Sequence, residues 1–328
     1  MARCLITGGA GFLGHHLTQH IMKNTDWEVV IFDKLSYASN GLERLKEIGA
    51  LSSRRVSYFT VDISQPISEG VEKEAGGFDY IFHLAAESHV DNSIADPEPF
   101  VVSNVLGTMR MLDLARRQEK LKKFLYFSTD EVFGPAPQGV YYNEWDRYRA
   151  SNPYSATKAG AEELCVAYHN TYEVPVIITH CMNAFGERQH PEKFIPMCIK
   201  KVLDGEKVLI HSDPSGKNAG SRFYIHARNT SAAVLFLADK GEVGDKYNIV
   251  GEREVDNLEM AKLIAETAGK KLKYEMLDFH SKRPGHDLRY ALNGKKMAEM
   301  GWRLPMSFEA SLRKTVRWTV EHPQWLEW

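Results

Sequence analysis

An acidic doublet is the first feature of this chain whose residue types suit proton transfer. Asp130 and Glu131 follow the apolar run Phe124–Ser128 almost directly. If that run is a strand of a parallel sheet, the doublet lies at the carboxyl edge of the sheet, where such sheets bind ligands. Two carboxylates there can divide acid and base roles when their surroundings separate their pKa values. Taken alone, the segment is equally compatible with a loop of ordinary solvated acids.

A tyrosine and a lysine form the second candidate pair. Tyr154 and Lys158 begin a helical pattern just after Pro153, and their spacing of four places both side chains on one helical face. A lysine ammonium near a phenol favours the ionised phenol, which makes Tyr154 a candidate base near neutral pH. A surface pair with the same spacing is common by chance, so the pair gains weight only beside a cofactor site.

A glycine-rich segment predicts that cofactor site. Residues 8–14 follow an apolar run and open a helical pattern. Glycines there permit a tight turn and let the backbone approach a pyrophosphate at a helix N-terminus. Asp33 ends the second predicted strand, 19 residues after Gly14, where a carboxylate binds the adenosine ribose hydroxyls and repels a 2′-phosphate. The sequence therefore favours NAD over NADP, although Lys34 is adjacent.

These residues need a sheet to bring them together. Through the first half of the chain, short apolar or β-branched runs alternate with helical patterns. This alternation predicts an α/β fold, a Rossmann-type doubly wound parallel sheet with helices on both faces. The predicted strands are Cys4–Thr7, Glu28–Phe32, Val56–Val61, Tyr80–Leu84, Phe124–Ser128 and Val176–His180, and the clearest predicted helices are Asn104–Glu119 and Ser155–Tyr172.

The second half of the chain is less regular and is expected to form a smaller mixed α/β substrate domain. Helical patterns recur at residues 257–268 and 308–321. A helix and a strand over residues 227–250 are expected to rejoin the first sheet. We therefore predict an NAD-binding domain of residues 1–182 with about 224–250, and a substrate domain of residues 183–223 and 251–328.

Composition excludes several classes of protein. The chain has 41 basic and 43 acidic side chains and a net charge of −2, which gives no electrostatic reason to expect nucleic acid or a membrane surface as a partner. Its longest fully apolar run is far shorter than the ~18 residues of a membrane span, and the first residues show no signal peptide. Four cysteines without a C-x-x-C pair predict free thiols in the cytoplasm, and the histidines lack metal-ligand spacing.

Longer motifs resemble the extended short-chain dehydrogenase/reductase family and, within it, the nucleotide-sugar 4,6-dehydratases. The resemblance covers almost the whole chain and implies NAD as cofactor. It also implies a homodimer in which helices 104–119 and 155–172 form a four-helix bundle. Beside the glycine segment and the Tyr154/Lys158 pair, the motifs are Phe32–Ala38, His83–Asp91, Ser128–Gly134, Pro191–Pro196 and Arg283–Tyr290.

The resemblance also implies roles for individual residues. The implied catalytic residues are Thr129, Asp130, Glu131, Tyr154 and Lys158. The implied cofactor-binding residues are Gly8, Gly11, Phe12, Leu13, Gly14, Asp33, Lys34, Ser36, Asp62, Ile63, Leu84, Ala85, Ala86, Ser103, Tyr154 and Lys158. The implied substrate-binding residues are Ser88, Ser128, Asn183, Lys193, Arg222, Asn248, Arg283 and His286.

The reaction implied is the conversion of an NDP-hexose to the 4-keto-6-deoxy sugar by internal hydride transfer and loss of water, as in deoxysugar biosynthesis, with dTDP-glucose or UDP-glucose favoured. In this reaction Tyr154 takes the proton of the carbon-4 hydroxyl, Glu131 takes the proton on carbon 5, and Asp130 protonates the departing hydroxyl. A UDP-sugar 4-epimerase or UDP-glucuronate decarboxylase is the alternative, although these enzymes usually lack the acidic doublet. A dinucleotide-sensing protein without turnover is more remote, because it would not need Thr129 together with the pair.

Two segments depart from the family pattern. Residues 183–187 read Asn-Ala-Phe-Gly-Glu where Asn-Asn-Tyr-Gly-Pro is usual, and residues 222–226 read Arg-Phe-Tyr-Ile-His where Arg-Asp-Trp-Leu-Tyr-Val is usual. We expect both departures to lie near the substrate, where they leave the nucleobase and the exact sugar open.

Overall fold

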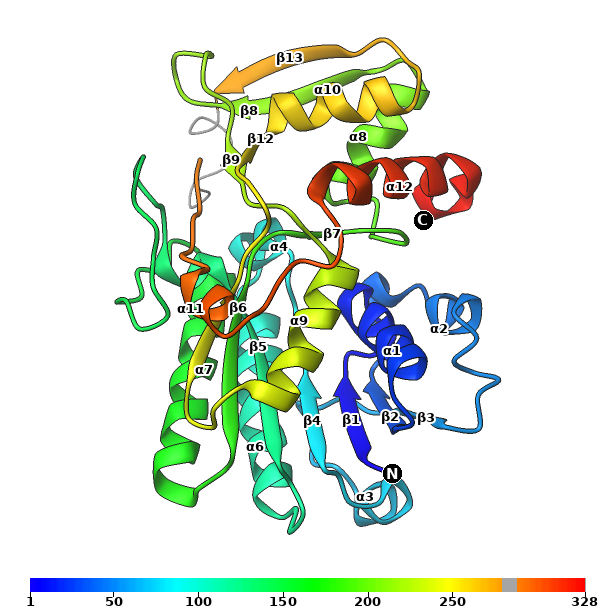
Figure 1. Ribbon diagram of the computed structural model, residues 1–328, viewed down its shortest axis with the longest axis vertical. Coiled ribbons are helices and arrows are strands. Elements are labelled where there is room, and N and C mark those ends of the chain that lie inside the picture. Colours follow the sequence, from blue (N-terminus) through cyan, green and yellow to red (C-terminus); the bar gives the residue numbers. More distant parts are fainter. Residues whose placement is uncertain (279–287, 328) are drawn as a thin grey trace.

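The near-continuous apolar runs of the first half form a single parallel sheet. The computed structural model describes residues 1–278 and 288–327, and within them the sheet has seven strands in the order β11-β6-β5-β4-β1-β2-β3. Figure 1 shows this sheet in the lower lobe of the molecule. The strands are β1 (Arg3–Thr7), β2 (Glu28–Asp33), β3 (Val56–Thr60), β4 (Tyr80–His83), β5 (Lys123–Thr129), β6 (Val176–Cys181) and β11 (Lys246–Ile249).

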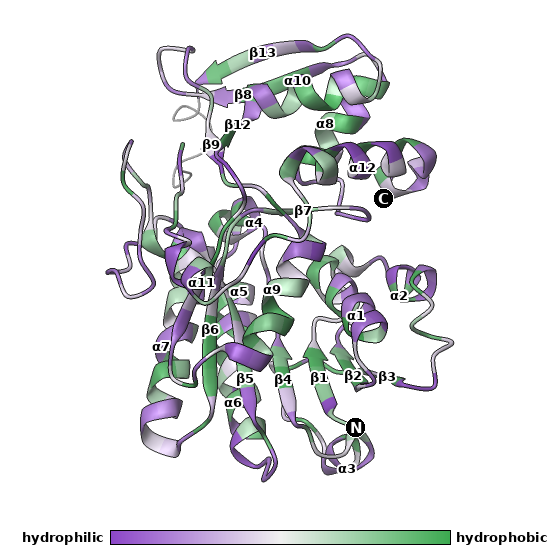
Figure 2. Cartoon of the chain, viewed as in Figure 1, coloured by the Kyte–Doolittle hydropathy of each residue, from purple (hydrophilic) through white to green (hydrophobic). Residues whose placement is uncertain are grey.

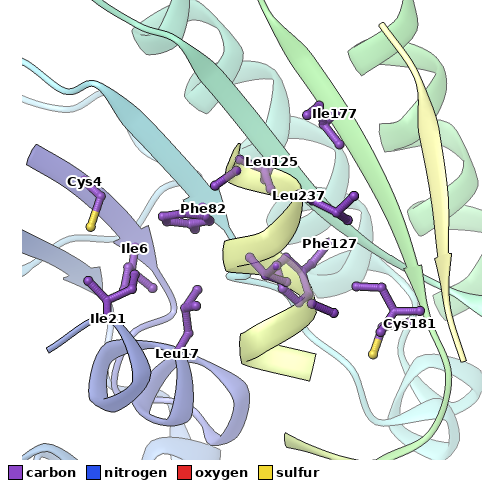
Figure 3. Packing of buried hydrophobic residues seen from close by; sticks show 14 of the residues in the cluster. Cys4, Ile6, Leu17, Ile21, Phe82, Leu125, Phe127, Ile177, Cys181 and Leu237 are labelled. Carbon is purple, nitrogen blue, oxygen red and sulfur yellow. The ribbon is translucent and has the colours of Figure 1, made fainter. Parts of the chain in front are cut away.

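Alternate residues of the strands build two separate cores, because successive side chains point to opposite faces of a sheet. On one face, Ile6 of β1 packs against the helices α1 (Phe12–Asn24) and α9 (Ala227–Lys240). Figure 3 shows this core, with Leu17, Ile21 and Leu237 reaching down to the strands. On the other face, Leu5 belongs to the core beneath α3 (Glu69–Ala75), α6 (Gly107–Arg116) and α7 (Pro153–Tyr172).

The order of the strands fixes where a ligand can bind. The chain runs from β1 outward through β2 to β3, and then crosses back to β4 on the other side of β1. The connections after β1 and β4 therefore diverge and leave a crevice at the carboxyl edge, which is the usual ligand position in such sheets. The glycine segment, Asp33, Leu84 and the acidic doublet all lie at or just after the ends of strands at this edge.

A smaller lobe covers that edge. Its parallel two-stranded sheet joins β8 (Lys207–Ser212) to β13 (Lys273–Asp278), beside the helices α8 (Phe194–Leu203), α10 (Asn257–Thr267) and α12 (Phe308–Glu321). These helices bury a third apolar core that includes Ile199, Ile264 and Leu312. Figure 2 shows hydrophobic and hydrophilic residues alternating along α10 and α12, as expected for helices that cover a core on one side.

Short elements complete the fold. They are η1 (Tyr37–Ser39), α2 (Glu43–Glu47), α4 (Val90–Ala95), α5 (Glu98–Phe100), η2 (Val101–Leu106), η3 (Asp130–Phe133), β7 (Ala184–Phe185), β9 (Ser221–Arg222), β10 (Ile225–His226), β12 (Val255–Asp256), α11 (Lys295–Glu299) and η4 (Pro323–Leu326). Several of them, such as η1, η3 and β7, line the crevice.

The predicted fold class, a doubly wound parallel sheet with a smaller lobe, is confirmed. The chain also returns to the sheet at β11, which pairs with β6, while the domain bounds themselves stay a prediction.

The helix expected over residues 104–119 differs from the structure at both ends. Its first residues belong to the π-helix η2, and α6 ends at Arg116. Apolar periodicity does not distinguish a π turn from an α turn, and such turns occur often at functional sites. None of the described helices is long and apolar enough to cross a membrane.

Candidate active site

The glycine segment forms the floor of a cavity of about 250 Å³ at the crevice. Gly8 has a φ of +70°, a backbone conformation that residues other than glycine rarely adopt. A Cβ on Gly14 would lie 2.1 Å from the carbonyl oxygen of Gly8, so only glycine permits this turn. The backbone is therefore free to approach a pyrophosphate at the start of α1, and a dinucleotide fits the geometry.

Asp33 stands at the end of β2 beside this loop. Its carboxylate accepts hydrogen bonds from the backbone N–H of Ala10, at 2.9 Å, and of Leu35, at 2.8 Å. Burial raises the pKa of Asp33, while these two bonds and the nearby Arg44 act in the opposite direction. Lys34 points across the rim and pairs with Glu87 at 2.7 Å. Both residues line the cavity, so the Asp33 carboxylate lies where it could contact the ribose of a bound dinucleotide.

The structure brings nearly all predicted cofactor residues to this cavity. The lining includes Gly8, Gly11, Phe12, Leu13, Gly14, Asp33, Lys34, Ser36, Ile63, Leu84, Ala85, Ala86, Ser103, Tyr154 and Lys158. Asp62 differs, because its side chain is exposed and accepts hydrogen bonds from the amide and hydroxyl of Ser64 instead. The carboxylate thus stabilises its own turn, and its neighbours in sequence line the cavity.

Sequence reasoning missed Arg44, which also lines the cavity. Its buried guanidinium donates hydrogen bonds to the carbonyl oxygens of Ala38 and Ser39, both at 2.8 Å. Burial lowers its pKa to about 10, so it is still charged at neutral pH. Arg44 therefore holds the segment after Asp33 in place. A lone arginine outside the recognised motifs gave no indication of this role.

A second cavity, of about 630 Å³, continues from the first into the space beneath the smaller lobe. The two share Ser128 and Tyr154 in their linings, so they form one continuous cleft. The second cavity brings together residues that lie far apart in the sequence. Its lining includes Ser88, Ser128, Thr129, Asp130, Glu131, Tyr154, Asn183, Lys193 and Arg222 among the predicted residues, and also His89, Phe194, Leu209, His211, Tyr224 and Asn257, which were not predicted.

Asn248, a predicted substrate residue, does not line the described cleft. Asn248 is 1% exposed, and its side chain binds His180 and the carbonyl oxygens of Tyr142 and Asn293. Its prediction as a substrate residue is therefore corrected to a buried structural position on β11. Arg283 and His286 lie outside the described residues.

The acidic doublet has two different environments. Asp130 is 2% exposed, and burial followed by the charge of Glu131 raises its pKa to about 7. One oxygen, Oδ1, accepts a hydrogen bond from the Thr129 hydroxyl at 3.0 Å, whereas Oδ2 has no partner among the described residues. Glu131 instead accepts a hydrogen bond from the Asn152 amide at 3.2 Å. Asp130 is thus suited to hold a proton, whereas the Glu131 carboxylate accepts a hydrogen bond and is suited to accept a proton.

Tyr154 and Lys158 occupy one face at the start of α7, as their spacing predicts. The helix begins with a capping box at Asn152, whose side chain accepts from the amide of Ser155. Burial lowers the pKa of Lys158 to about 8, and its ammonium lies 4.3 Å from the centre of the Tyr126 ring. Burial and then Glu131 raise the pKa of Tyr154, although a hydrogen bond to Thr129 acts against this. Ionisation of Tyr154 therefore requires nearby positive charge.

One residue from each segment that departs from the family pattern pairs with the other, away from the cleft. Glu187 and His226 are both buried, and their side chains pair at 3.0 Å, with Arg228 at 3.2 Å from the same carboxylate. Neither residue lines the described cleft. The expectation that the departing segments lie near the substrate therefore does not hold for these two positions. Ala184 and Tyr224, from the same two segments, do line the cleft.

A parallel sheet in this strand order, with a glycine loop and a tyrosine–lysine pair at its carboxyl edge, defines the extended short-chain dehydrogenase/reductase class. The family model described as GDP-mannose 4,6 dehydratase matches residues 5–315. The chain therefore belongs to this family of nucleotide-sugar dehydratases, and the family predicted from the motifs is confirmed.

Individual relatives agree with this assignment. The dTDP-glucose 4,6-dehydratase of Escherichia coli is 37% identical, over 99% of this chain and 94% of its own length. A low-salt glycan biosynthesis protein of Haloferax volcanii is 39% identical over 95% and 96%. The dTDP-glucose 4,6-dehydratase of Streptomyces venezuelae, solved with NAD bound, has a TM-score of 0.87 at 33% identity and covers 99% of both chains.

Proposed function

We propose that this protein is an NAD-dependent nucleotide-sugar 4,6-dehydratase, a lyase that converts an NDP-glucose to the 4-keto-6-deoxy sugar with loss of water. The observation that carries the proposal is the acidic doublet. Asp130 and Glu131 stand in contrasting environments within the same cleft as Tyr154 and Lys158. Oxidation of a sugar needs only the pair, whereas elimination of water also needs one proton donor and one acceptor.

The residues divide the reaction as follows. Tyr154 takes the proton of the carbon-4 hydroxyl, helped by its hydrogen bond to Thr129 and by the charge of Lys158. The ketone that results acidifies the proton on carbon 5, which Glu131 accepts as an ionised carboxylate. Asp130, whose pKa of about 7 keeps a proton available, protonates the departing carbon-6 hydroxyl. NAD⁺, when bound, supplies the electron acceptor for carbon 4 and the reductant for carbon 6.

The cofactor would be held by the glycine loop and by Asp33. The loop offers backbone N–H groups at the start of α1 to the pyrophosphate, and the Asp33 carboxylate faces the ribose hydroxyls. Lys158 and Tyr154 line the inner end of the same cavity, where the nicotinamide would lie. Because the cofactor is regenerated in each cycle, tight retention suits the chemistry.

The substrate would occupy the larger cavity. Lys193 and Arg222 supply positive charge to a diphosphate there. We favour dTDP-glucose or UDP-glucose as the substrate, and relatives named as dTDP-glucose 4,6-dehydratases support the first. A role in deoxysugar biosynthesis follows from the proposed product.

The decisive experiment incubates the purified protein separately with dTDP-glucose, UDP-glucose and GDP-mannose and measures the mass of the products. We expect loss of one water from dTDP-glucose or UDP-glucose, with NAD neither consumed nor required in excess. Epimerisation or loss of carbon dioxide from a UDP sugar, without loss of water, would refute the dehydratase function in favour of the alternatives.

We further propose a homodimer, formed through α6 and α7. Ile94 and Val101, on short helices next to α7, are 39% and 50% exposed, which is unusual for apolar side chains of this size unless a partner covers them. A cytoplasmic location is proposed because all four cysteines are free and buried. Light scattering of the purified protein tests the dimer, for which we expect twice the mass of the chain.

A further inference from the structure

A fully buried carboxylate lies behind the catalytic pair. Glu162 follows Lys158 by one helical turn on α7 and is 0% exposed. Its carboxylate accepts hydrogen bonds from the hydroxyls of Ser128 and Tyr148. An isolated buried carboxylate is very costly, so such a group is kept only where its charge is compensated. The proposed reaction does not use Glu162, although the residue adjoins groups that the reaction does use.

Two further side chains compensate the charge of Glu162. His180 of β6 approaches the carboxylate at 3.0 Å, and Lys246 of β11 lies at 3.6 Å. Lys246 also donates a hydrogen bond to the Tyr148 hydroxyl. Burial opposes ionisation of Glu162, but His180, Lys246 and the Ser128 hydroxyl together lower its pKa below the usual range. Glu162 is therefore ionised.

The hydrogen bonds define the charge of His180. Its Nδ1 lies 3.0 Å from Oδ1 of Asn248, and its Nε2 faces the Glu162 carboxylate. The orientation of Asn248 is set by its amide nitrogen, which donates to the carbonyl oxygens of Tyr142 and Asn293, both at 3.1 Å. Each ring nitrogen of His180 thus faces an acceptor that has no proton to donate, so both must carry a proton.

This cluster contacts both halves of the catalytic machinery. Ser128 immediately precedes Thr129, Asp130 and Glu131 and lines both cavities, so its bond to Glu162 anchors the acidic segment. On the other side, the negative charge of Glu162 raises the pKa of Lys158, against the larger effect of burial. The ionisable groups that act on Lys158 are Glu162 and Cys165 on α7, and its ammonium acts in turn on His83 of β4 and lies over the Tyr126 ring of β5.

We propose that Glu162 is a positioning residue for sugar oxidation, which keeps Lys158 charged and holds Ser128, while His180 and Lys246 on its far side limit the strength of its field. The inference rests on the proposed function, because Lys158 matters only if Tyr154 removes a proton. It predicts that removing the negative charge of Glu162 and removing the positive charge of Lys246 shift the pKa of Lys158 in opposite directions.

The test is the pH dependence of NADH formation in a single turnover with the nucleotide sugar that the protein dehydrates. The alkaline limb of that profile reports loss of the Lys158 proton. Glu162→Gln removes a negative charge, so we expect the limb to move to lower pH by about one unit. Lys246→Met removes a positive charge, so the limb should move to higher pH by roughly half a unit, less than for Glu162, which is the stronger of the two charges acting on Lys158.

A matched control separates charge from structure. Tyr148→Phe removes a hydroxyl that binds Glu162 and Lys246 but changes no charge. Its profile should keep the limb where it is, even if the overall rate or the stability falls. A limb that stays in place in a folded Glu162→Gln protein, or that moves the same way in both charge variants, would overturn the proposal.

A second readout does not depend on turnover. In histidine-labelled protein at pH 7, nitrogen NMR should show both ring nitrogens of His180 protonated, with the signals assigned by their loss in His180→Gln. Lys246→Met leaves Glu162 in place and should still show both His180 ring nitrogens protonated. This variant therefore keeps the proposal testable if Glu162→Gln does not fold. A neutral His180 would refute the cluster as described. Failure of the parent protein to form NADH with any nucleotide sugar would instead refute the proposed function.

Discussion

Replacing Asp130 with asparagine keeps the shape of the side chain and removes the only proton donor that we assign to water loss. Burial and Glu131 raise the pKa of Asp130 from 3.8 to about 7. About half of the molecules therefore hold the proton at pH 7, whereas an ordinary aspartate would hold it in roughly one molecule in a thousand. The site thus supplies a proton donor at neutral pH that the residue type alone would not.

The expected kinetic result follows from this role. Asp130→Asn should slow water loss by ~10²–10⁴-fold, the usual contribution of a general acid. Oxidation at carbon 4 depends on Tyr154, Thr129 and Lys158 and should be spared. Enzyme-bound NADH and a 4-keto-hexose that retains its 6-hydroxyl should therefore accumulate, as measured by absorbance and by mass spectrometry of the quenched sugar nucleotide.

The same substitution should stabilise the protein at alkaline pH. A raised pKa means that folding disfavours the charged aspartate, so this penalty is absent below pH 3.8 and grows as pH rises to about 7. Converted at 1.36 kcal/mol per pKa unit, the full penalty is at most about 4 kcal/mol at pH 8. Asp130→Asn should recover part of it at pH 8 and progressively less toward pH 4, as measured by urea denaturation.

Asp239→Asn is the matched control, because that side chain is 73% exposed and lies outside the cleft. It should change neither the rate of water loss nor the stability at pH 8. Dehydration at the parent rate in Asp130→Asn would refute the assigned role. A stability gain that is absent at pH 8, or equal at all pH values, would refute the account of its pKa.

Three other substitutions or conditions test the remaining assignments. Asp33→Ala should purify with less NAD and discriminate less against NADP, and unchanged cofactor content would contradict its role. Tyr154→Phe should bind the substrate by calorimetry but form NADH ~10²–10⁴-fold more slowly, whereas a normal rate would identify another base. Burial lowers the pKa values of His16 and His83 to about 3, so below pH 6.5 each binds a proton in the unfolded chain but not in the folded protein. Each histidine should therefore reduce the free energy of unfolding by about 2 kcal/mol at pH 5 relative to pH 7.5. In the Asp130→Asn background, which removes the opposing titration, urea denaturation should show lower stability at pH 5 than at pH 7.5, and equal stability would refute this.

Much of the cofactor cavity could be predicted from the sequence because its residues follow strands in order. Gly8, Asp33 and Leu84 each come at or just after the end of an apolar run, and the carboxyl ends of parallel strands share one edge. The apolar runs and the shared carboxyl edge of the strands are enough to predict that these residues lie close together. Asp62 satisfies the same pattern and yet turns away, because the hydroxyl and amide of Ser64 offer its carboxylate nearer partners.

The larger cavity was only partly predictable. Lys193 and Arg222 were identified by resemblance, whereas His211 and Asn257 carry no motif and reach the cleft because the smaller lobe folds over the sheet. Asn248 shows the opposite error, since its position in β11 directs the side chain to His180 rather than to the substrate. Such outcomes depend on long-range packing that no local spacing records.

The sequence by itself determined the alternation of strands and helices, the glycine loop with its acidic partner, and the identity of the catalytic groups, because these depend on residue type and short spacing. Only the tertiary structure decided how those groups ionise. Asp130 and Lys158 have perturbed pKa values through burial and through neighbours such as Glu131 and Glu162. Glu187 and His226 pair across 39 residues of sequence. Electrostatic energy depends on distance and solvent exposure, and these quantities exist only once the chain is folded.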